Sequence, residues 1–574
     1  MFRQFTFGIV ALVGSIVAVS LGRSPAQAQV SAPVAASCGA LAEMRIPASS
    51  IGLPTSGATI ASAELVPAAP LRSDGRGTLL ATPDYCKVVG FIAPVDPTAP
   101  RINFQMNMPT DWNGKIAQMG GSGTNGSVPG AVTSMRNGPE STPPNAPYAL
   151  SRGFVVYGSD SGHQNAPGGA GPGARGGPGQ LADWMRNTEA HHNLLYAQMK
   201  KTHDVAVVLV RALYDRPIRH SYYLGSSQGG REALLVAQRY PQDYDGVFSQ
   251  VPILPYTHLT VFEGFYRSKA QMGDAWIPAS KIPAIAAEVR RQCDALDGIA
   301  DGIISHYTAC NRKFDTSVTP HPLTAIRCPG GKDTGDSCLS DSQITAVNQV
   351  HAPVNFPFPL YKGWTSMPGW GTGSESATNW KSLGARPDPG APLGGNLALL
   401  ASDPAATAGT ADLKTYQKAI QEFSALGDAT DPDLAAFQRR GGKLILKVNT
   451  TDYTANPRWS MAYYDKVVAT MGQRSVDQFL RFYVAAGIFH GLNVGRNPVT
   501  NEPVPNYVDF LGLLDDWVEK GTAPADTQVL MDMETAPPFT VKSTFPLCRY
   551  PTYAKYLGSG DPREAKSYVC ARPL

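Results

Sequence analysis

The run from Tyr222 to Gly230 constrains the fold of this chain more than any other stretch. Its letters, YYLGSSQGG, contain the pattern G-x-S-x-G with Ser227 at the centre. A β-prone apolar run enters the pattern, and a helix-like segment over residues 233–237 leaves it. Such a sharp strand–turn–helix has no room for side chains at its glycines, and it lifts the serine hydroxyl clear of the sheet. The pattern predicts a nucleophilic serine, although short matches also arise by chance in a chain with 57 glycines.

Strand-like runs on both sides of this turn indicate the fold class. Two alternating runs, at 88–92 and 102–106, predict antiparallel strands that open a sheet. Further apolar runs are found at 115–119, 154–157, 246–251, 443–448 and 479–484, and a helix-like segment spans 183–214. Strands that alternate with helices predict an α/β protein with a mainly parallel core sheet.

Residues 253–440 break this rhythm. The stretch is rich in Pro, Gly and Trp, and it holds four of the eight cysteines. Because an α/β core rarely contains so long a connection, we expect an inserted lid domain there, with the catalytic domain formed by 29–252 and 441–574.

Residues 1–28 have the form of a secretion signal. Arg3 precedes an apolar stretch from Phe7 to Leu21, and Ala26-Gln27-Ala28 is a small-x-small cleavage site. A membrane anchor is the alternative, but the apolar stretch is short for a span of about 20 residues. We therefore predict a secreted or periplasmic protein. Without Arg3 and Arg23 the formal net charge falls from +3 to +1, so no nucleic-acid partner is expected.

The cysteines fall into four couples of sequence neighbours, which predicts four disulfides in an exported protein. The couples are Cys38 with Cys86, Cys293 with Cys310, Cys328 with Cys338, and Cys548 with Cys570. Zinc is not expected, since no C-x-x-C spacing occurs.

A base and an acid follow the serine in the order that this kind of turn requires. Asp452 and His490 each come directly after a late predicted strand. His490 would take the Ser227 proton, and Asp452 would orient the imidazole. Taken singly, Asp452 also suits an ordinary turn and His490 an ordinary surface histidine; their order and placement favour a triad.

Two backbone regions are candidate oxyanion donors. One is the start of the helix after Ser227, at Gln228, and the other is the glycine cluster that follows the strand at 115–119. The residues do not decide among Gly121, Ser122 and Gly123; we take Gly123 as the candidate.

An acidic loop in the inserted segment has the composition of a cation site. Asp294, Asp297 and Asp301 recur at intervals of three and four residues, and the carbonyls of Ile299 and Ile303 complete a set suited to Ca²⁺. The spacing is not that of an EF-hand. A loop of Asx turns closed by a Cys293–Cys310 disulfide explains the spacing equally well. Because the loop is far in sequence from Ser227, its metal would be structural.

Over nearly the whole mature chain the sequence resembles the tannase and feruloyl esterase family of secreted α/β-hydrolases, which includes mono(2-hydroxyethyl) terephthalate hydrolase. The resemblance is carried by WNGK (112–115), SYYLG (221–225), GGR (229–231), AQRYP (237–241), DPDL (431–434), GGKLIL (441–446), DWVE (516–519) and PLC (546–548). It implies the triad, the oxyanion amides, the lid calcium and the four disulfides named above.

The resemblance also implies an activity, the hydrolysis of esters of aromatic acids of the galloyl, feruloyl or terephthaloyl type through an acyl-enzyme. Trp364, Trp370, Trp380 and Phe423 are candidate pocket walls, although core packing suits each one singly. The alternatives are an esterase or lactonase for non-aromatic or polyester-derived substrates, and a binding protein that has lost turnover.

One departure from the family concerns a disulfide beneath the triad. The family has a cysteine just before the nucleophile and another just after the histidine, where this chain has Ser226 and Gly491. Packing and hydrogen bonds must then hold Ser227 and His490 without that bond.

Overall fold

The computed structural model describes Met1 and residues 37–74, 77–133, 142–164, 183–371, 386–391, 393, 395–403, 405–490 and 495–573. Apart from Met1, the predicted secretion signal lies outside these residues, as do Trp380 and Gly491. No helix in the described part of the chain is long and apolar enough to span a membrane.

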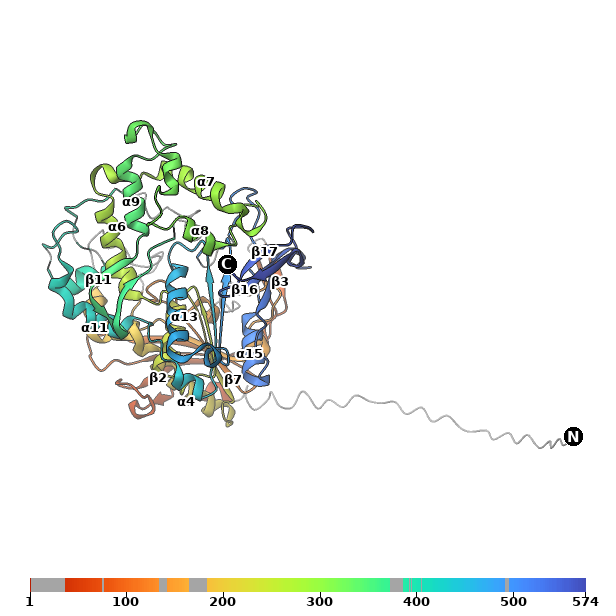
Figure 1. Ribbon diagram of the computed structural model, residues 1–574. Coiled ribbons are helices and arrows are strands. Elements are labelled where there is room, and N and C mark those ends of the chain that lie inside the picture. Colours follow the sequence, from red (N-terminus) through yellow and green to blue (C-terminus); the bar gives the residue numbers. More distant parts are fainter. Residues whose placement is uncertain are drawn as a thin grey trace.

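Within the described residues a twelve-stranded mixed sheet runs through the molecule (Figure 1). In spatial order its strands are β1 (Arg45–Ile46), β2 (Ala58–Val66), β5 (Tyr85–Ile92), β6 (Ile102–Pro109), β8 (Val155–Ser159), β7 (Lys115–Met119), β9 (His220–Ser226), β10 (Gly246–Gln250), β13 (Lys443–Asn449), β14 (Leu480–Ala485), β16 (Val541–Arg549) and β15 (Thr527–Met533). The strands from β8 to β14 in this order are parallel, and antiparallel strands flank them on both sides. The predicted α/β class, with its antiparallel opening strands, is confirmed.

Helices cover both faces of the parallel strands, which explains why those strands are buried along nearly their whole length. Alternate residues point to opposite faces. Tyr223 and Val247 pack with α5 (Gln228–Arg239) on one face, while Tyr222 and Phe248 pack with α15 (Phe510–Lys520) on the other. The remaining helices around the sheet are α2 (Gly130–Thr133), α3 (Thr188–His192), α4 (Gln198–Tyr214), α13 (Pro457–Met471) and α14 (Gln473–Val476).

The predicted helix over 183–214 is broken into pieces. A π-helical turn, Asn193–Ala197, separates α3 from α4, and a 3₁₀ turn at Asp183–Arg186 precedes them. Periodicity alone does not distinguish these turns from a continuous α-helix.

The segment between β10 and β13 forms a body of helices at one end of the sheet, with α6 to α9 at the top of Figure 1. Its elements are α6 (Gly264–Ala270), α7 (Ile282–Cys293), α8 (Tyr307–Lys313), α9 (Asp341–His351), β11 (Val354–Leu360), β12 (Trp364–Met367), α10 (Gly395–Ala401), α11 (Gln417–Gly427) and α12 (Ala435–Arg439). Among the described residues none of these elements joins the large sheet, since β11 and β12 pair only with each other.

The two ends of this segment lie side by side against α5. The N–H of Ala429 donates to the carbonyl of Leu254 at 2.9 Å. The N–H of Thr257 donates to the Asp428 carboxylate at 2.7 Å. Arg231 of α5, which is fully buried, donates to the carbonyl of Gly427 at 2.8 Å. The inserted segment is thereby joined directly to the helix that follows Ser227.

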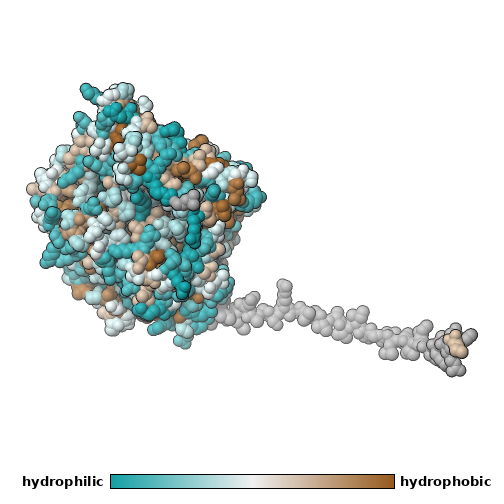
Figure 2. Space-filling view, in the orientation of Figure 1, coloured by the Kyte–Doolittle hydropathy of each residue, from teal (hydrophilic) through white to brown (hydrophobic). Residues whose placement is uncertain are grey.

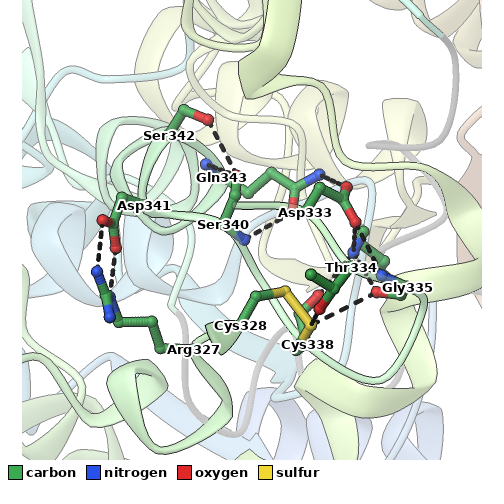
Figure 3. Close-up of a disulfide and its surroundings, with 11 residues drawn as sticks. Arg327, Cys328, Asp333, Thr334, Gly335, Cys338, Ser340, Asp341, Ser342 and Gln343 are labelled. Atoms are coloured by element: carbon green, nitrogen blue, oxygen red, sulfur yellow. Dashed lines mark hydrogen bonds and ion pairs between the residues drawn. A yellow bond between two sulfur atoms is a disulfide. The ribbon is translucent and has the colours of Figure 1, made fainter. Parts of the chain in front are cut away.

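The four predicted disulfides are all present with the predicted pairing. Figure 3 shows the bond between Cys328 and Cys338, which closes a loop beside α9. Within that loop Asp333 accepts hydrogen bonds from Gln343 at 2.9 Å and from the buried Lys281 at 3.0 Å. The disulfide and the polar contacts together hold this outlying loop.

The C-terminal part carries a second small sheet, β17 (Tyr553–Tyr556) with β18 (Tyr568–Ala571), and the Cys548–Cys570 bond joins it to β16. Another hairpin, β3 (Arg72–Asp74) with β4 (Gly77–Leu79), extends from the N-terminal half. On the face shown in Figure 2, hydrophobic residues occur in small groups between hydrophilic ones.

Candidate active site

Ser227 sits on a strained turn between β9 and α5, with φ 59° and ψ −117°. A side chain at Gly225 would place its Cβ 2.0 Å from the carbonyl oxygen of Gly229, and one at Gly229 would lie 2.7 Å from the carbonyl oxygen of Gly121. Both glycines are therefore required by contact with backbone atoms, and the predicted strand–turn–helix is confirmed.

Ser227, His490 and Asp452 form one hydrogen-bonded chain. His490 Nε2 lies 2.8 Å from Ser227 Oγ, and His490 Nδ1 lies 2.8 Å from Asp452 Oδ2. Asp452 is fully buried, and its other oxygen accepts the backbone N–H groups of Thr454 and Ala455 at 2.8 Å each. The three side chains meet because β9, β13 and β14 are parallel, so their carboxyl ends share one edge of the sheet.

Hydrogen bonds between the acid loop and the histidine loop hold His490 in place. Asn449, buried at the end of β13, donates its side-chain amide to the carbonyl of Phe489 at 2.7 Å. The N–H of Gly487 donates to Thr450 Oγ1 at 3.1 Å. Sequence reasoning missed Asn449, whose only signal is a polar residue at the end of an apolar strand. Ser226 Oγ, at the position of the family's cysteine, is buried without a hydrogen-bond partner among the described residues.

The glycine cluster after β7 lies against the first turn of α5. The N–H of Gly121 donates to Glu232 Oε2 at 3.0 Å, and the carbonyl of Gly121 accepts the N–H of Gly229 at 3.0 Å. Because the Gly121 amide is engaged, Ser122 and Gly123 are the remaining candidates for the second oxyanion donor. Gly123 has φ 60°. Gln228 begins α5, where backbone N–H groups lack intrahelical acceptors.

The acidic loop follows α7. Asp294 accepts the N–H of Gly302 at 3.0 Å, Asp297 accepts that of Ser305 at 2.7 Å, and Asp301 accepts that of Ile303 at 2.9 Å. Burial, with Asp301 and Asp294 nearby, raises the pKa of Asp297 to about 7.

The donor set of this loop fits a hard cation. Asp297 is buried, Asp294 and Asp301 are partly buried, and backbone carbonyls lie in the same loop; none of the three carboxylates forms an ion pair with a lysine or arginine among the described residues. In the present geometry the three carboxylates face backbone amides, and they do not all come within 4.8 Å of one another.

The acidic loop lies beside the triad loops, although it is far from Ser227 in sequence. A Cβ at Gly487 would lie 3.2 Å from the Ile303 side chain, and Asn497 donates to the carbonyl of Asp301 at 2.7 Å. A cavity of about 20 Å³, large enough for one water, is lined by Ile303, Thr450, Thr451 and Gly487 among others. The loop therefore supports the segments that carry Asp452 and His490.

The candidate wall aromatics that the structure describes are core residues. Trp364 donates to the carbonyl of Thr430 at 3.1 Å, Trp370 donates to Glu263 at 2.7 Å, and both are 8% exposed. Phe423 is 3% exposed within the same hydrophobic cluster. Sequence reasoning missed Tyr453, which is 44% exposed and lies edge-on to His490 with ring centroids 6.2 Å apart.

Comparisons with known proteins agree on one family. The model of the family described as tannase and feruloyl esterase matches residues 86–387 and 397–571. An uncharacterized esterase of Agrobacterium fabrum is 33% identical over 98% of both chains. Mono(2-hydroxyethyl) terephthalate hydrolase of Piscinibacter sakaiensis is 31% identical over 86% of both chains.

Solved structures show the same fold. Feruloyl esterase B from Aspergillus oryzae superposes with a TM-score of 0.71 at 22% identity, covering 94% of this chain and 100% of that one. Tannin acyl hydrolase from Aspergillus niger superposes with a TM-score of 0.62 at 19% identity, covering 92% of this chain and 94% of that one. Because the family model matches most of this chain, the chain belongs to the tannase and feruloyl esterase family and is a carboxylic ester hydrolase.

Proposed function

We propose that this protein is a serine esterase that cleaves esters of aromatic carboxylic acids through an acyl-enzyme. The observation that carries the proposal is the continuous chain Ser227–His490–Asp452, with 2.8 Å at both links. A nucleophile, a base and a buried orienting acid in this geometry suit acyl transfer.

In the proposed reaction each residue of the triad has a defined role. Ser227 Oγ attacks the ester carbonyl while its proton passes to His490 Nε2. The carbonyl oxygen gains negative charge and is stabilised by the N–H groups of Gln228 and of Gly123 or Ser122. The bond to the alcohol oxygen then breaks, and His490 returns the proton to that oxygen. Water, deprotonated by His490, then attacks the acyl carbon. The bond from that carbon to Ser227 Oγ breaks, His490 returns the proton to Ser227 Oγ, and the acid is released.

The proposal of an aromatic acid rests on the relatives, whose names include mono(2-hydroxyethyl) terephthalate hydrolase, feruloyl esterase and tannin acyl hydrolase. Tyr453 supports it, because this exposed ring lies beside His490, where a flat acyl group could pack against it.

The test is hydrolysis of a small ester panel by the wild type and by Ser227→Ala. The panel holds methyl gallate, methyl ferulate, mono(2-hydroxyethyl) terephthalate and an aliphatic p-nitrophenyl ester. We expect an aromatic-acid ester to be cleaved and Ser227→Ala to lose about 10⁴-fold or more of kcat. Cleavage of the aliphatic ester alone would assign a non-aromatic substrate, and cleavage of nothing would contradict the enzyme assignment.

We further propose that Asp294, Asp297 and Asp301, with the carbonyls of Ile299 and Ile303, hold a structural Ca²⁺. When bound, the cation supplies charge that offsets one buried and two partly buried carboxylates. The position of the loop beside the triad segments supports a structural role.

Calcium removal tests this site. At a free calcium concentration 100 times the Kd, binding stabilises the folded protein by about 2.7 kcal/mol, so a chelator should lower the Tm by several degrees. Asp297→Asn should reduce the calcium bound per chain, whereas Asp315→Asn, at an exposed turn of the same segment, should not. Equal calcium content in wild type and Asp297→Asn would refute the assignment.

We also propose that the protein is exported. The four disulfides support an oxidising compartment, and the form of residues 1–28 supports a cleaved signal. Sequencing the N-terminus of the exported protein tests the expected start near Gln29.

A further inference from the structure

Glu232 is a fully buried carboxylate that the proposed reaction does not use. It lies on α5, one helical turn after Gln228. Its Oε2 accepts the N–H of Gly121 at 3.0 Å and the hydroxyl of Tyr223 at 2.8 Å. Its Oε1 accepts the side-chain amides of Asn125 at 2.6 Å and Gln198 at 3.2 Å. A carboxylate removed from water is costly unless such donors compensate it.

The four donors come from three separate parts of the fold. Gly121 and Asn125 belong to the loop after β7, Tyr223 belongs to β9, and Gln198 begins α4. Asn125 also donates to Ser161 at 2.6 Å, just beyond the end of β8. Glu232 thus joins the nucleophile helix to the carboxyl ends of its neighbouring strands.

Gly121 is attached to α5 through both of its backbone groups. Its N–H donates to Glu232, and its carbonyl accepts the N–H of Gly229 at 3.0 Å. The preceding residue, Gly120, also packs tightly against α5, because a Cβ at Gly120 would lie 2.7 Å from the Cα of Gly229. The two candidate oxyanion amides flank this contact, since Gln228 precedes Gly229 and Ser122 and Gly123 follow Gly121.

We propose that Glu232 is a positioning residue that fixes the loop 120–125 against α5, and so sets the spacing of the two oxyanion donors. The inference rests on the proposed function, because it assigns a role to that same site. Glu232 touches neither substrate nor Ser227; it acts through Gly121. An oxyanion hole stabilises the transition state only when its donors are fixed before charge develops, so a loosened loop should lower kcat and leave KM nearly unchanged.

Two substitutions at this position separate shape from hydrogen bonding. Glu232→Met keeps the length of the side chain but removes both acceptors, so kcat should fall about 10²-fold with KM within about threefold. Glu232→Gln keeps one oxygen for Gly121 and Tyr223, while its amide faces Asn125 and Gln198, whose side-chain amides can turn to accept. Glu232→Gln should therefore recover kcat to within about tenfold of the wild type.

Asp515 of α15, on the opposite face of the sheet, offers a control. It accepts the hydroxyl of Tyr222 at 2.6 Å and the ammonium of Lys115 at 2.6 Å, which resembles the Glu232–Tyr223 contact one residue along the strand. Asp515→Leu removes a carboxylate that also accepts a tyrosine hydroxyl, although its side chain is 21% exposed, and leaves the loop 120–125 untouched. It should lower the Tm and leave kcat within about threefold of the wild type.

The experiment measures kcat, KM, Tm and amide hydrogen exchange over residues 120–125 in the wild type and these three variants. We expect Glu232→Met alone to lose kcat and to exchange faster in that loop. It should also lose affinity for an aryl trifluoromethyl ketone, whose serine adduct carries an oxyanion.

A Glu232→Met protein that lowers the Tm as Asp515→Leu does, with kcat and ketone affinity retained, would overturn the inference. If the wild type cleaves no ester, the proposed function fails separately. Amide hydrogen exchange over residues 120–125 then still tests the positioning role of Glu232. Unchanged exchange in Glu232→Met would overturn that role, and faster exchange would support it.

Discussion

At the scale of single residues, His490 depends on a hydrogen bond that the triad itself does not include. Asn449 binds the carbonyl of Phe489, the residue directly before His490, at 2.7 Å. The family's disulfide at this place is missing, since Ser226 occupies one of its two positions. A buried amide–carbonyl bond therefore fixes the backbone next to the base.

Removing this bond should impair catalysis as well as stability. Asn449→Ala leaves the Phe489 carbonyl unpaired and costs about 1–3 kcal/mol of unfolding free energy, but misplacing the imidazole should lower kcat about tenfold. Asn113→Ala is the control, because Asn113 makes the same kind of bond, to the carbonyl of Arg152 at 2.8 Å, near the amino-terminal end of β7. Equal kcat in both variants would show that Asn449 has no special role.

Sequence reasoning identified the triad residues but not their supporting side chains, for a physical reason. Ser227, Asp452 and His490 carry reactive groups in a fixed order at the ends of predictable strands. Asn449 binds the carbonyl of Phe489, and Glu232 binds the N–H of Gly121. Composition and residue spacing cannot predict such a bond, because its backbone partner is distant in the chain. Such contacts become visible only once the strands are placed.

At the scale of elements, α5 links the nucleophile to the inserted segment. Arg231 donates to the carbonyls of Leu194 and Leu195 in the π-helical turn and to that of Gly427 at the end of α11. It also lies with its guanidinium 4.8 Å from the centre of the Tyr256 ring. One buried side chain thus joins three elements that converge behind Ser227.

Arg231→Met should destabilise the protein, because three buried carbonyls lose their donors at a cost of about 1–3 kcal/mol each. Arg239→Met is the matched control on the same helix. Arg239 donates to the carbonyls of Ala425 and Leu426 nearer the surface, so its loss should cost less than about 1 kcal/mol. Urea unfolding of both variants measures the difference; equal midpoints would contradict the account of α5 as the link.

The strands and helices of the core were predictable because their hydrophobic patterns are local. The π-helical turn before α4 was not predicted; two of its carbonyls accept hydrogen bonds from Arg231, a residue of another helix. The acidic loop presents a similar case. Its residues were recognised from sequence, but its place beside Thr450 and Gly487 follows only from the fold, because separation along a chain does not measure distance in space.

At the scale of the whole molecule, one edge of the sheet gathers the reacting groups. The carboxyl ends of β7, β9, β13 and β14 supply, in turn, the glycine loop and the proposed nucleophile, acid and base. The inserted segment stands at this edge. The disulfides join the N-terminal segment to β5, α7 to α8 across the acidic loop, the two ends of the loop 328–338, and β16 to β18. Ser227, His490 and Asp452 are held by hydrogen bonds and packing.

The central claim, that Ser227 is the nucleophile of an acyl-enzyme, is tested most directly by mass spectrometry of the protein after reaction with an aryl phosphonate ester. We predict one adduct per chain, on the peptide that contains Ser227, formed in step with loss of ester hydrolysis and absent from Ser227→Ala. An adduct on another serine, or hydrolysis that survives full labelling of Ser227, would contradict it.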